Sequence, residues 1–306
     1  MMFKRIGFFL VTNLAIILTI QLILELVGAK PWMTRSGIDY QSLAVFCLIY
    51  GMVGSFISLQ LSKFSAKMMY GVKIINPDQP GQYSELVQMI RRLTQSAGLP
   101  KLPEIGVYNS PEVNAFATGP SQSRALVAVS QGLLNTMDRN QIEAVMAHEI
   151  AHIKNGDMVT MALIQGVINA FVMFFARILA FVVSQAIQNR NSDDGEASHS
   201  PWLQFILVEV FSLLFGFLGM MVVCYFSRQR EFRADRGAGQ YAGREKMISA
   251  LEALGSLSGR RALPATQADA LAVYKISGGR SRGIGALFMT HPPIEERIKA
   301  LQSFAT

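Results

Sequence analysis

Four long apolar stretches constrain this chain more than any other feature of its sequence. A helix needs about 20 mostly apolar residues to cross the hydrocarbon core of a bilayer. The stretches cover residues 6–27, 43–61, about 158–187 and 205–226. Because charged residues make up only 16% of the chain, against roughly 25% in soluble domains, we expect a membrane protein with four transmembrane helices.

The first stretch resembles a signal peptide because Lys4 and Arg5 precede it. Its apolar core is longer than the roughly 7–15 residues of a signal sequence, and no A-x-A cleavage site follows. We therefore interpret it as a retained helix.

Cations beside the apolar stretches indicate the orientation, since Lys and Arg are enriched on the cytoplasmic side. They precede the first and third stretches and follow the second and fourth: Lys4, Arg5, Lys154, Lys63, Lys67, Arg228, Arg230, Arg233 and Arg236. We expect both termini, residues 70–157 and residues 227–306 to be cytoplasmic. The net charge of +7 suits these loops and an anionic leaflet. No aromatic-studded basic stripe indicates a nucleic-acid partner.

The cytoplasmic parts combine helices with a few short strands. An amphipathic helix is expected over residues 82–98, and three extended segments separated by turn residues predict a small antiparallel sheet. A helix should then begin at Asp138, with Gln141 completing a capping box. The predicted organisation has four parts: two transmembrane helices (1–67), a cytoplasmic part (68–157), two further transmembrane helices (158–227) and a cytoplasmic helical part (228–306).

The segment MAHEIAHIKNGD lies on that helix and contains two of the four histidines of the chain. His148 and His152 are four residues apart, so both project from one face and can reach one metal ion. Glu149 points about 100° round the helix and can reach a metal-bound water, as in the H-E-x-x-H arrangement. The alternative is a chance match on a helix with two buried histidines.

A catalytic zinc site needs a third protein ligand and an open position. His199 falls in the predicted outer loop, whereas His291 and Glu231 fall on the cytoplasmic side. Glu231 could bind the ion while Asp235, four residues on, accepts a proton from a ligand histidine. The two acids could instead form a solvated pair that balances nearby arginines.

Taken together, HEIAHIKNGD, EFRAD, NAFATG, MTHPP and the order of the four spans resemble the HtpX family, membrane-integrated zinc metalloproteases related to the CAAX prenyl peptidases. The resemblance implies an α+β, mainly helical membrane protein with a gluzincin-like protease domain. It implies one zinc ion per chain, held by His148, His152 and Glu231, with Glu149 as general base and acid. It also implies a cytoplasmic active site in the bacterial inner membrane, degradation of misfolded membrane proteins under stress, and self-cleavage.

Two further segments are candidates for contacts with the substrate. His291 could stabilise the transition state, or it could only pack at the helix entry formed by the HPP turn. Asn114, Ala115, Phe116 and Ala117 could form an edge strand that pairs with an extended substrate, or an ordinary sheet strand.

The candidate partners implied by this resemblance are membrane protein substrates, the lipid bilayer and other membrane proteases. Two rival functions stay open. One is a prenyl-type C-terminal peptidase. The other is a non-catalytic membrane scaffold stabilised by zinc, in which a closed site with four ligands would be expected.

Overall fold

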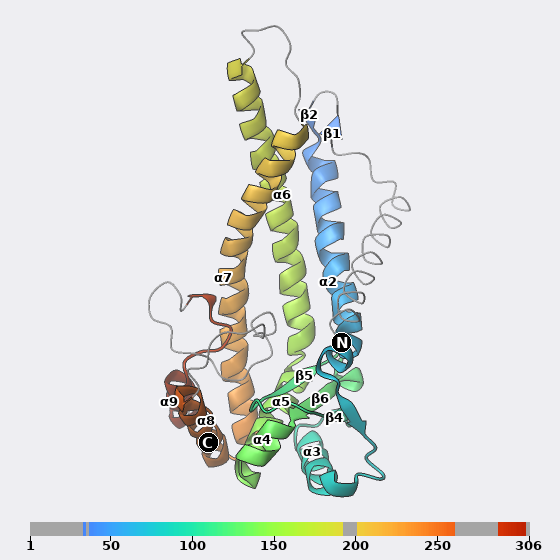
Figure 1. Ribbon diagram of the computed structural model, residues 1–306, viewed down its shortest axis with the longest axis vertical. Coiled ribbons are helices and arrows are strands. Elements are labelled where there is room, and N and C mark those ends of the chain that lie inside the picture. Colours follow the sequence, from blue (N-terminus) through green and yellow to red (C-terminus); the bar gives the residue numbers. More distant parts are fainter. Residues whose placement is uncertain (1–32, 35–36, 192–200, 261–286, 304–306) are drawn as a thin grey trace. The chain divides into compact units, whose positions relative to one another are not determined.

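The computed structural model describes residues 33–34, 37–191, 201–260 and 287–303. The described part is mainly helical, with three long helices and small sheets (Figure 1). The chain divides into two compact units. The membrane unit comprises Met1–Ser58 and Ala162–Val223, and the sheet unit comprises Leu59–Met161 and Cys224–Thr306.

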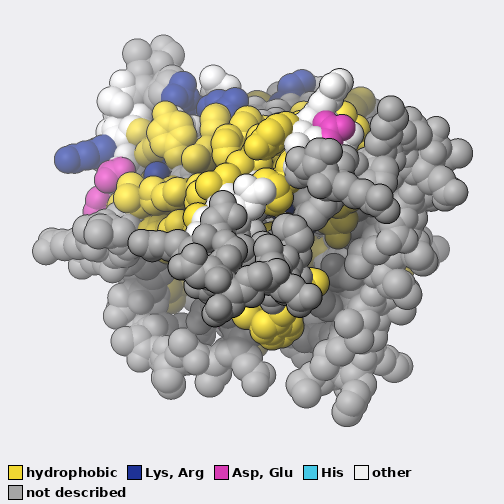
Figure 2. Space-filling model, turned by 90° about the horizontal axis from the view of Figure 1, so that it is seen from above, with side chains coloured by type: hydrophobic (Ala, Val, Ile, Leu, Met, Phe, Trp, Pro, Cys, Tyr) yellow, Lys and Arg dark blue, Asp and Glu magenta, His cyan; other side chains and the backbone are white. Residues whose placement is uncertain are grey.

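Three helices of the described residues are long and apolar enough to cross a membrane. They are α2 (Tyr40–Tyr70), α6 (Asp157–Asn191) and α7 (Pro201–Ala242), which match the second, third and fourth apolar stretches. The first stretch, residues 6–27, lies outside the described residues. Hydrophobic side chains cover much of the described surface in the space-filling view (Figure 2), as is expected of helices that face lipid.

Helix α7 is longer than a bilayer requires. Its 42 residues extend about 63 Å at 1.5 Å per residue, roughly twice the 30 Å hydrocarbon core. The apolar stretch ends near residue 226, and the turns beyond it belong to the sheet unit. This extension contains Glu231 and Asp235.

The sheet unit contains the remaining long elements. Its strands are β3 (Lys73–Ile75), β4 (Glu104–Tyr108), β5 (Ala115–Thr118) and β6 (Leu126–Ser130); its helices are α3 (Ser84–Ser96), α4 (Gln131–Thr136), α5 (Arg139–Asn155), α8 (Arg244–Arg260) and α9 (Ile294–Gln302). Short 3₁₀ turns lie at Gly81–Tyr83 and Gln122–Arg124. In the membrane unit, β1 (Met33–Thr34) pairs with β2 (Gly37–Ile38).

The prediction of a purely antiparallel sheet is wrong. The strand order is β3-β4-β6-β5, and β4 runs parallel to β6. After β4 the chain passes to the outer edge, forms β5, and returns as β6 between β5 and β4. Strand β6 is buried at every position, which is typical of a central strand covered on both faces.

Helix α5 is held in the core by its ends and by its apolar residues. Asp138 and Gln141 form the predicted capping box at its start, and Gly156 ends it in the left-handed conformation, with φ 67°. Val145, Met146, Ile150 and Ile153 lie in one core cluster with residues of α3, β4, β6 and α8. The site described next is therefore built on a helix that packing fixes from several sides.

Candidate metal centre

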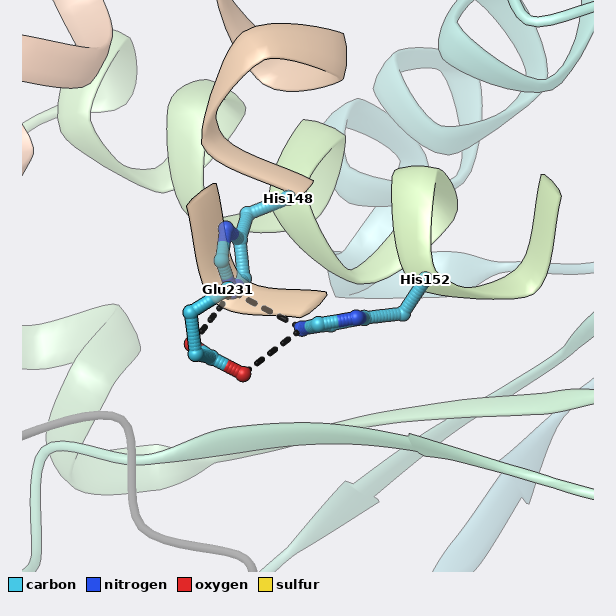
Figure 3. Close-up of side chains that lie close together, drawn as sticks. All are labelled: His148, His152 and Glu231. Atoms are coloured by element: carbon cyan, nitrogen blue, oxygen red, sulfur yellow. Dashed lines mark hydrogen bonds and ion pairs between the residues drawn. The ribbon is translucent and has the colours of Figure 1, made fainter. Parts of the chain in front are cut away.

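Two helices bring three potential ligands together. His148 and His152 project from α5, and Glu231 comes from the extension of α7, so that all three side chains point toward one another (Figure 3). The two Nε2 atoms are 3.0 Å apart. Nε2 of His148 and Nε2 of His152 each lie 3.3 Å from one oxygen of Glu231. Among the described residues, this is the group of side chains that could hold a metal ion.

These separations fit a divalent ion with tetrahedral coordination. Ligands about 2.0–2.1 Å from such an ion are roughly 3.3 Å from one another. Both carboxylate oxygens of Glu231 are buried without a well-aligned hydrogen bond among the described residues. Arg230 and Arg297 come no closer to them than 3.7 Å, and a bound cation would compensate further for the burial of this charge. The side chain of His152 is 12% exposed, so the group is not sealed on all sides. The residues present therefore fit a metal ion with room for a further ligand.

A buried carboxylate lies behind His148. Nδ1 of His148 is 2.9 Å from Oδ1 of Asp235, and both residues are almost fully buried. Burial alone would lower the pKa of His148, but Asp235 and Glu231 outweigh it and raise this pKa to about 9. The same negative charge favours a bound cation. The alternative that Glu231 and Asp235 form a solvated pair is wrong, because both are buried.

Arg297 holds Asp235 in place. This arginine comes from α9, is fully buried, and donates two hydrogen bonds to the Asp235 carboxylate, from Nε at 2.7 Å and from a terminal nitrogen at 2.6 Å. Burial would lower the pKa of Arg297, yet the Asp235 carboxylate raises it above its ordinary value. Asp235 therefore stays ionised behind His148.

A second carboxylate lies behind His152. Oδ2 of Asp157 is 2.6 Å from Nδ1 of His152. This contact leaves Nε2 of His152 directed at His148 and Glu231. In the tautomer that donates from Nδ1 to the carboxylate, Nε2 is the nitrogen available to a metal ion.

The other predicted residues lie close to this group. Glu149 is buried on α5, between the two histidines in sequence. Nδ1 of His291 is 2.9 Å from Oε2 of Glu231. Arg228 fixes the segment that leads to His291, because it donates to the backbone carbonyls of Leu287 and Met289.

The segment Asn114–Ala117 comprises the first three residues of the edge strand β5 and the residue before them. Ala115, Phe116 and Ala117 belong to β5, which contacts α5, and Asn114 donates its backbone N–H to Ser130 Oγ. The side-chain oxygen of Asn114 is buried and lacks a hydrogen-bond partner among the described residues. The substrate-binding candidates thus border the helix that carries the histidines.

Sequence reasoning missed Asp157 and Arg297 as members of this cluster. A signal for Arg297 was present, since Ile294, Arg297 and Leu301 are spaced at i, i+3 and i+7, the spacing of the helix stripe that packs inward. Asp157 gave no such signal, because its contact with His152 depends on the end of helix α5 at the left-handed Gly156.

A buried His–His–Glu group from an HExxH helix and from the end of a membrane-spanning helix defines a membrane metalloprotease. Comparison with known proteins gives the same class. Residues 80–305 match Peptidase family M48. The chain is 47% identical to a Protease HtpX homolog of Thiobacillus denitrificans over 98% of this chain and 99% of that protein. It is 49% identical to the Protease HtpX of Aeromonas hydrophila over 98% and 99%.

The chain belongs to peptidase family M48 and, within it, to the HtpX proteases, which confirms the resemblance seen in its motifs. It is a membrane-bound metalloprotease. Its fold is similar to that in the crystal structure of S. mikatae Ste24p, with a TM-score of 0.59, 17% identity, and coverage of 97% of this chain and 66% of that one.

Proposed function

We propose that this chain is a zinc endopeptidase of the bacterial inner membrane that cleaves misfolded or damaged membrane proteins from the cytoplasmic side, as part of the response to stress. The observation that carries the proposal is the buried group of His148, His152 and Glu231, with Glu149 on the same helix. One zinc ion per chain would be held there. Both termini are assigned to the cytoplasm because the cations flanking the apolar stretches favour that side.

The residues around the site have separate roles in peptide hydrolysis. Zinc supplies a Lewis acid that makes water more acidic and polarises the peptide carbonyl. Glu149 accepts the proton from the attacking water and then gives it to the leaving amine. Asp235 would accept a hydrogen bond from Nδ1 of His148, so that Nε2 is the nitrogen that gives up its proton when the metal binds. His291 is the candidate donor to the developing oxyanion, since it already lies beside Glu231.

Strand β5 is the proposed docking edge for the substrate. It pairs with β6 on one side and is the last strand in the order of the described sheet. The Ser130 N–H donates to the Asn114 carbonyl, and hydrogen-bonded pairs alternate along an antiparallel ladder. The backbone groups of Ala115 and Ala117 therefore face away from β6. Ala115 is buried, whereas Ala117 is partly exposed, so an extended peptide would pair at Ala117. Backbone pairing would set the register while reading the substrate sequence only loosely.

We expect Ala117→Pro to lower kcat/KM for an unfolded protein substrate by about 2- to 10-fold, because proline removes one donor and a hydrogen bond is worth about 0.5–1.5 kcal/mol. Proline is tolerated where the N–H of an edge strand faces outward, so the zinc content should not change. Ala117→Ser keeps the N–H and serves as the matched control. Equal kcat/KM in all three proteins would exclude pairing through this amide.

The number of metal ligands disfavours the alternative of a non-catalytic scaffold. A structural zinc site is usually closed by four protein ligands, whereas three side chains of the described residues meet here and His152 is partly exposed. The proposal is tested by co-expressing the chain, or its Glu149→Gln form, with a panel of membrane proteins and following their degradation. Degradation only with the unsubstituted chain supports the proposal. Cleavage of a prenylated peptide without cleavage of unprenylated casein would favour the prenyl-type peptidase instead.

A further inference from the structure

Asp157 is a buried acid that the catalytic roles above do not use. It is the first residue of α6 and is 1% exposed. Removing a carboxylate from water costs several kcal/mol unless it gains a partner. The partner here is Nδ1 of His152, at 2.6 Å, slightly shorter than the roughly 2.7–2.9 Å of charge-assisted N–H···O hydrogen bonds.

The contact depends on the break between α5 and α6. In an uninterrupted helix, residues five apart are rotated by about 500°, which places them roughly 140° apart around the axis. Residues 152 and 157 would then face different sides. Gly156 adopts φ 67°, a left-handed conformation that glycine takes without steric cost. The chain is redirected there, and Asp157 meets the ring of His152.

A carboxylate from a different helix lies beside Nδ1 of each histidine. Asp235, on the α7 extension, lies 2.9 Å from Nδ1 of His148, and Asp157, on α6, lies 2.6 Å from Nδ1 of His152. In both rings this leaves Nε2 directed into the group that also contains Glu231.

We propose that Asp157 is a positioning residue for the metal centre, which accepts the Nδ1 proton of His152 and so fixes both the tautomer and the direction of this ligand. The inference rests on the proposed zinc site. It joins the metal centre to the first turn of a membrane-spanning helix, because one residue belongs to both.

The competing explanation is that Asp157 only stabilises the start of α6, where negative charge interacts favourably with the helix dipole. Serine and asparagine are also good residues at a helix start, so both substitutions keep the capping hydrogen bond and lose the charge equally. A role confined to the helix start therefore predicts the same effect for both. Serine is too short to reach His152, and asparagine keeps an acceptor oxygen but loses the charge. The pair of variants therefore separates the two explanations.

The test measures zinc affinity of the full-length purified chain by competition with a chromophoric chelator. We expect Asp157→Ser to weaken zinc binding by about 10- to 100-fold and Asp157→Asn to weaken it less. The unfolding midpoint of the metal-free protein should stay at the unsubstituted value in both. Asp138→Ser is the matched control, since it makes the same change at the exposed start of α5 and keeps a capping residue.

Unchanged zinc affinity in Asp157→Ser would overturn the inference. So would an equal loss in Asp138→Ser, or a metal-free midpoint that falls together with the affinity. If the unsubstituted chain itself binds no zinc, it is the proposed function that fails.

Discussion

Glu149→Gln should keep its zinc and lose about 10²- to 10⁴-fold in peptide cleavage, the contribution typical of a positioned general base. Glu149 is buried on α5, and glutamine has nearly the same shape, so the helix should pack as before. Glutamine cannot take a proton from water. Cleavage of an unfolded protein substrate and the zinc content should be measured on the same purified sample.

Glu245→Gln is the control for this variant, because it makes the same chemical change on α8 at a side chain that is 84% exposed. It should keep both zinc and cleavage. Cleavage by Glu149→Gln at the unsubstituted rate would remove Glu149 from the mechanism, whereas a loss of zinc would mean that it supports the metal instead.

Arg297→Met should lower the free energy of unfolding of the sheet unit by about 3–5 kcal/mol, the cost of leaving one charge of a buried pair alone. Arg297 and Asp235 are both buried, and two hydrogen bonds join them. Methionine fills much of the volume of the arginine side chain but carries no charge to neutralise Asp235. Chemical unfolding of the detergent-solubilised, metal-free protein provides the measurement.

Two further variants check the reason for this loss. Arg139→Met removes an exposed arginine that pairs with Glu85 on the surface, and should cost no more than about 1 kcal/mol. Adding Asp235→Asn to Arg297→Met removes the stranded charge and should recover part of the stability. Additive losses in the double variant would show that the pair is not energetically coupled.

Sequence reasoning succeeds where local pattern determines structure. The capping box at Asp138 and the apolar periodicity define α5, and the three apolar stretches within the described residues correspond to α2, α6 and α7. The ligand candidates followed from helical spacing and from an even number of membrane crossings between His152 and Glu231, and the three side chains do lie together.

It fails where the partner lies far away in the chain, and where a contact depends on a backbone conformation that periodicity does not predict. The parallel pairing of β4 with β6 was missed because neighbouring strands were assumed to pair in order, although the continuous apolar run in β6 indicates a central strand. Arg297 lies 62 residues from Asp235, and the local pattern of PPIEERIKA does not predict which residue it binds. The contact of Asp157 with His152 requires the left-handed Gly156, which periodicity does not predict.

The central claim is that Glu231 joins His148 and His152 in binding one zinc ion. It is tested most directly by metal analysis of the purified chain and of Glu231→Gln, which removes the charge and keeps the shape. The account predicts one zinc per chain in the unsubstituted protein and a large loss of zinc in Glu231→Gln, with the fold retained by circular dichroism. Full zinc occupancy and unchanged affinity in Glu231→Gln would contradict it.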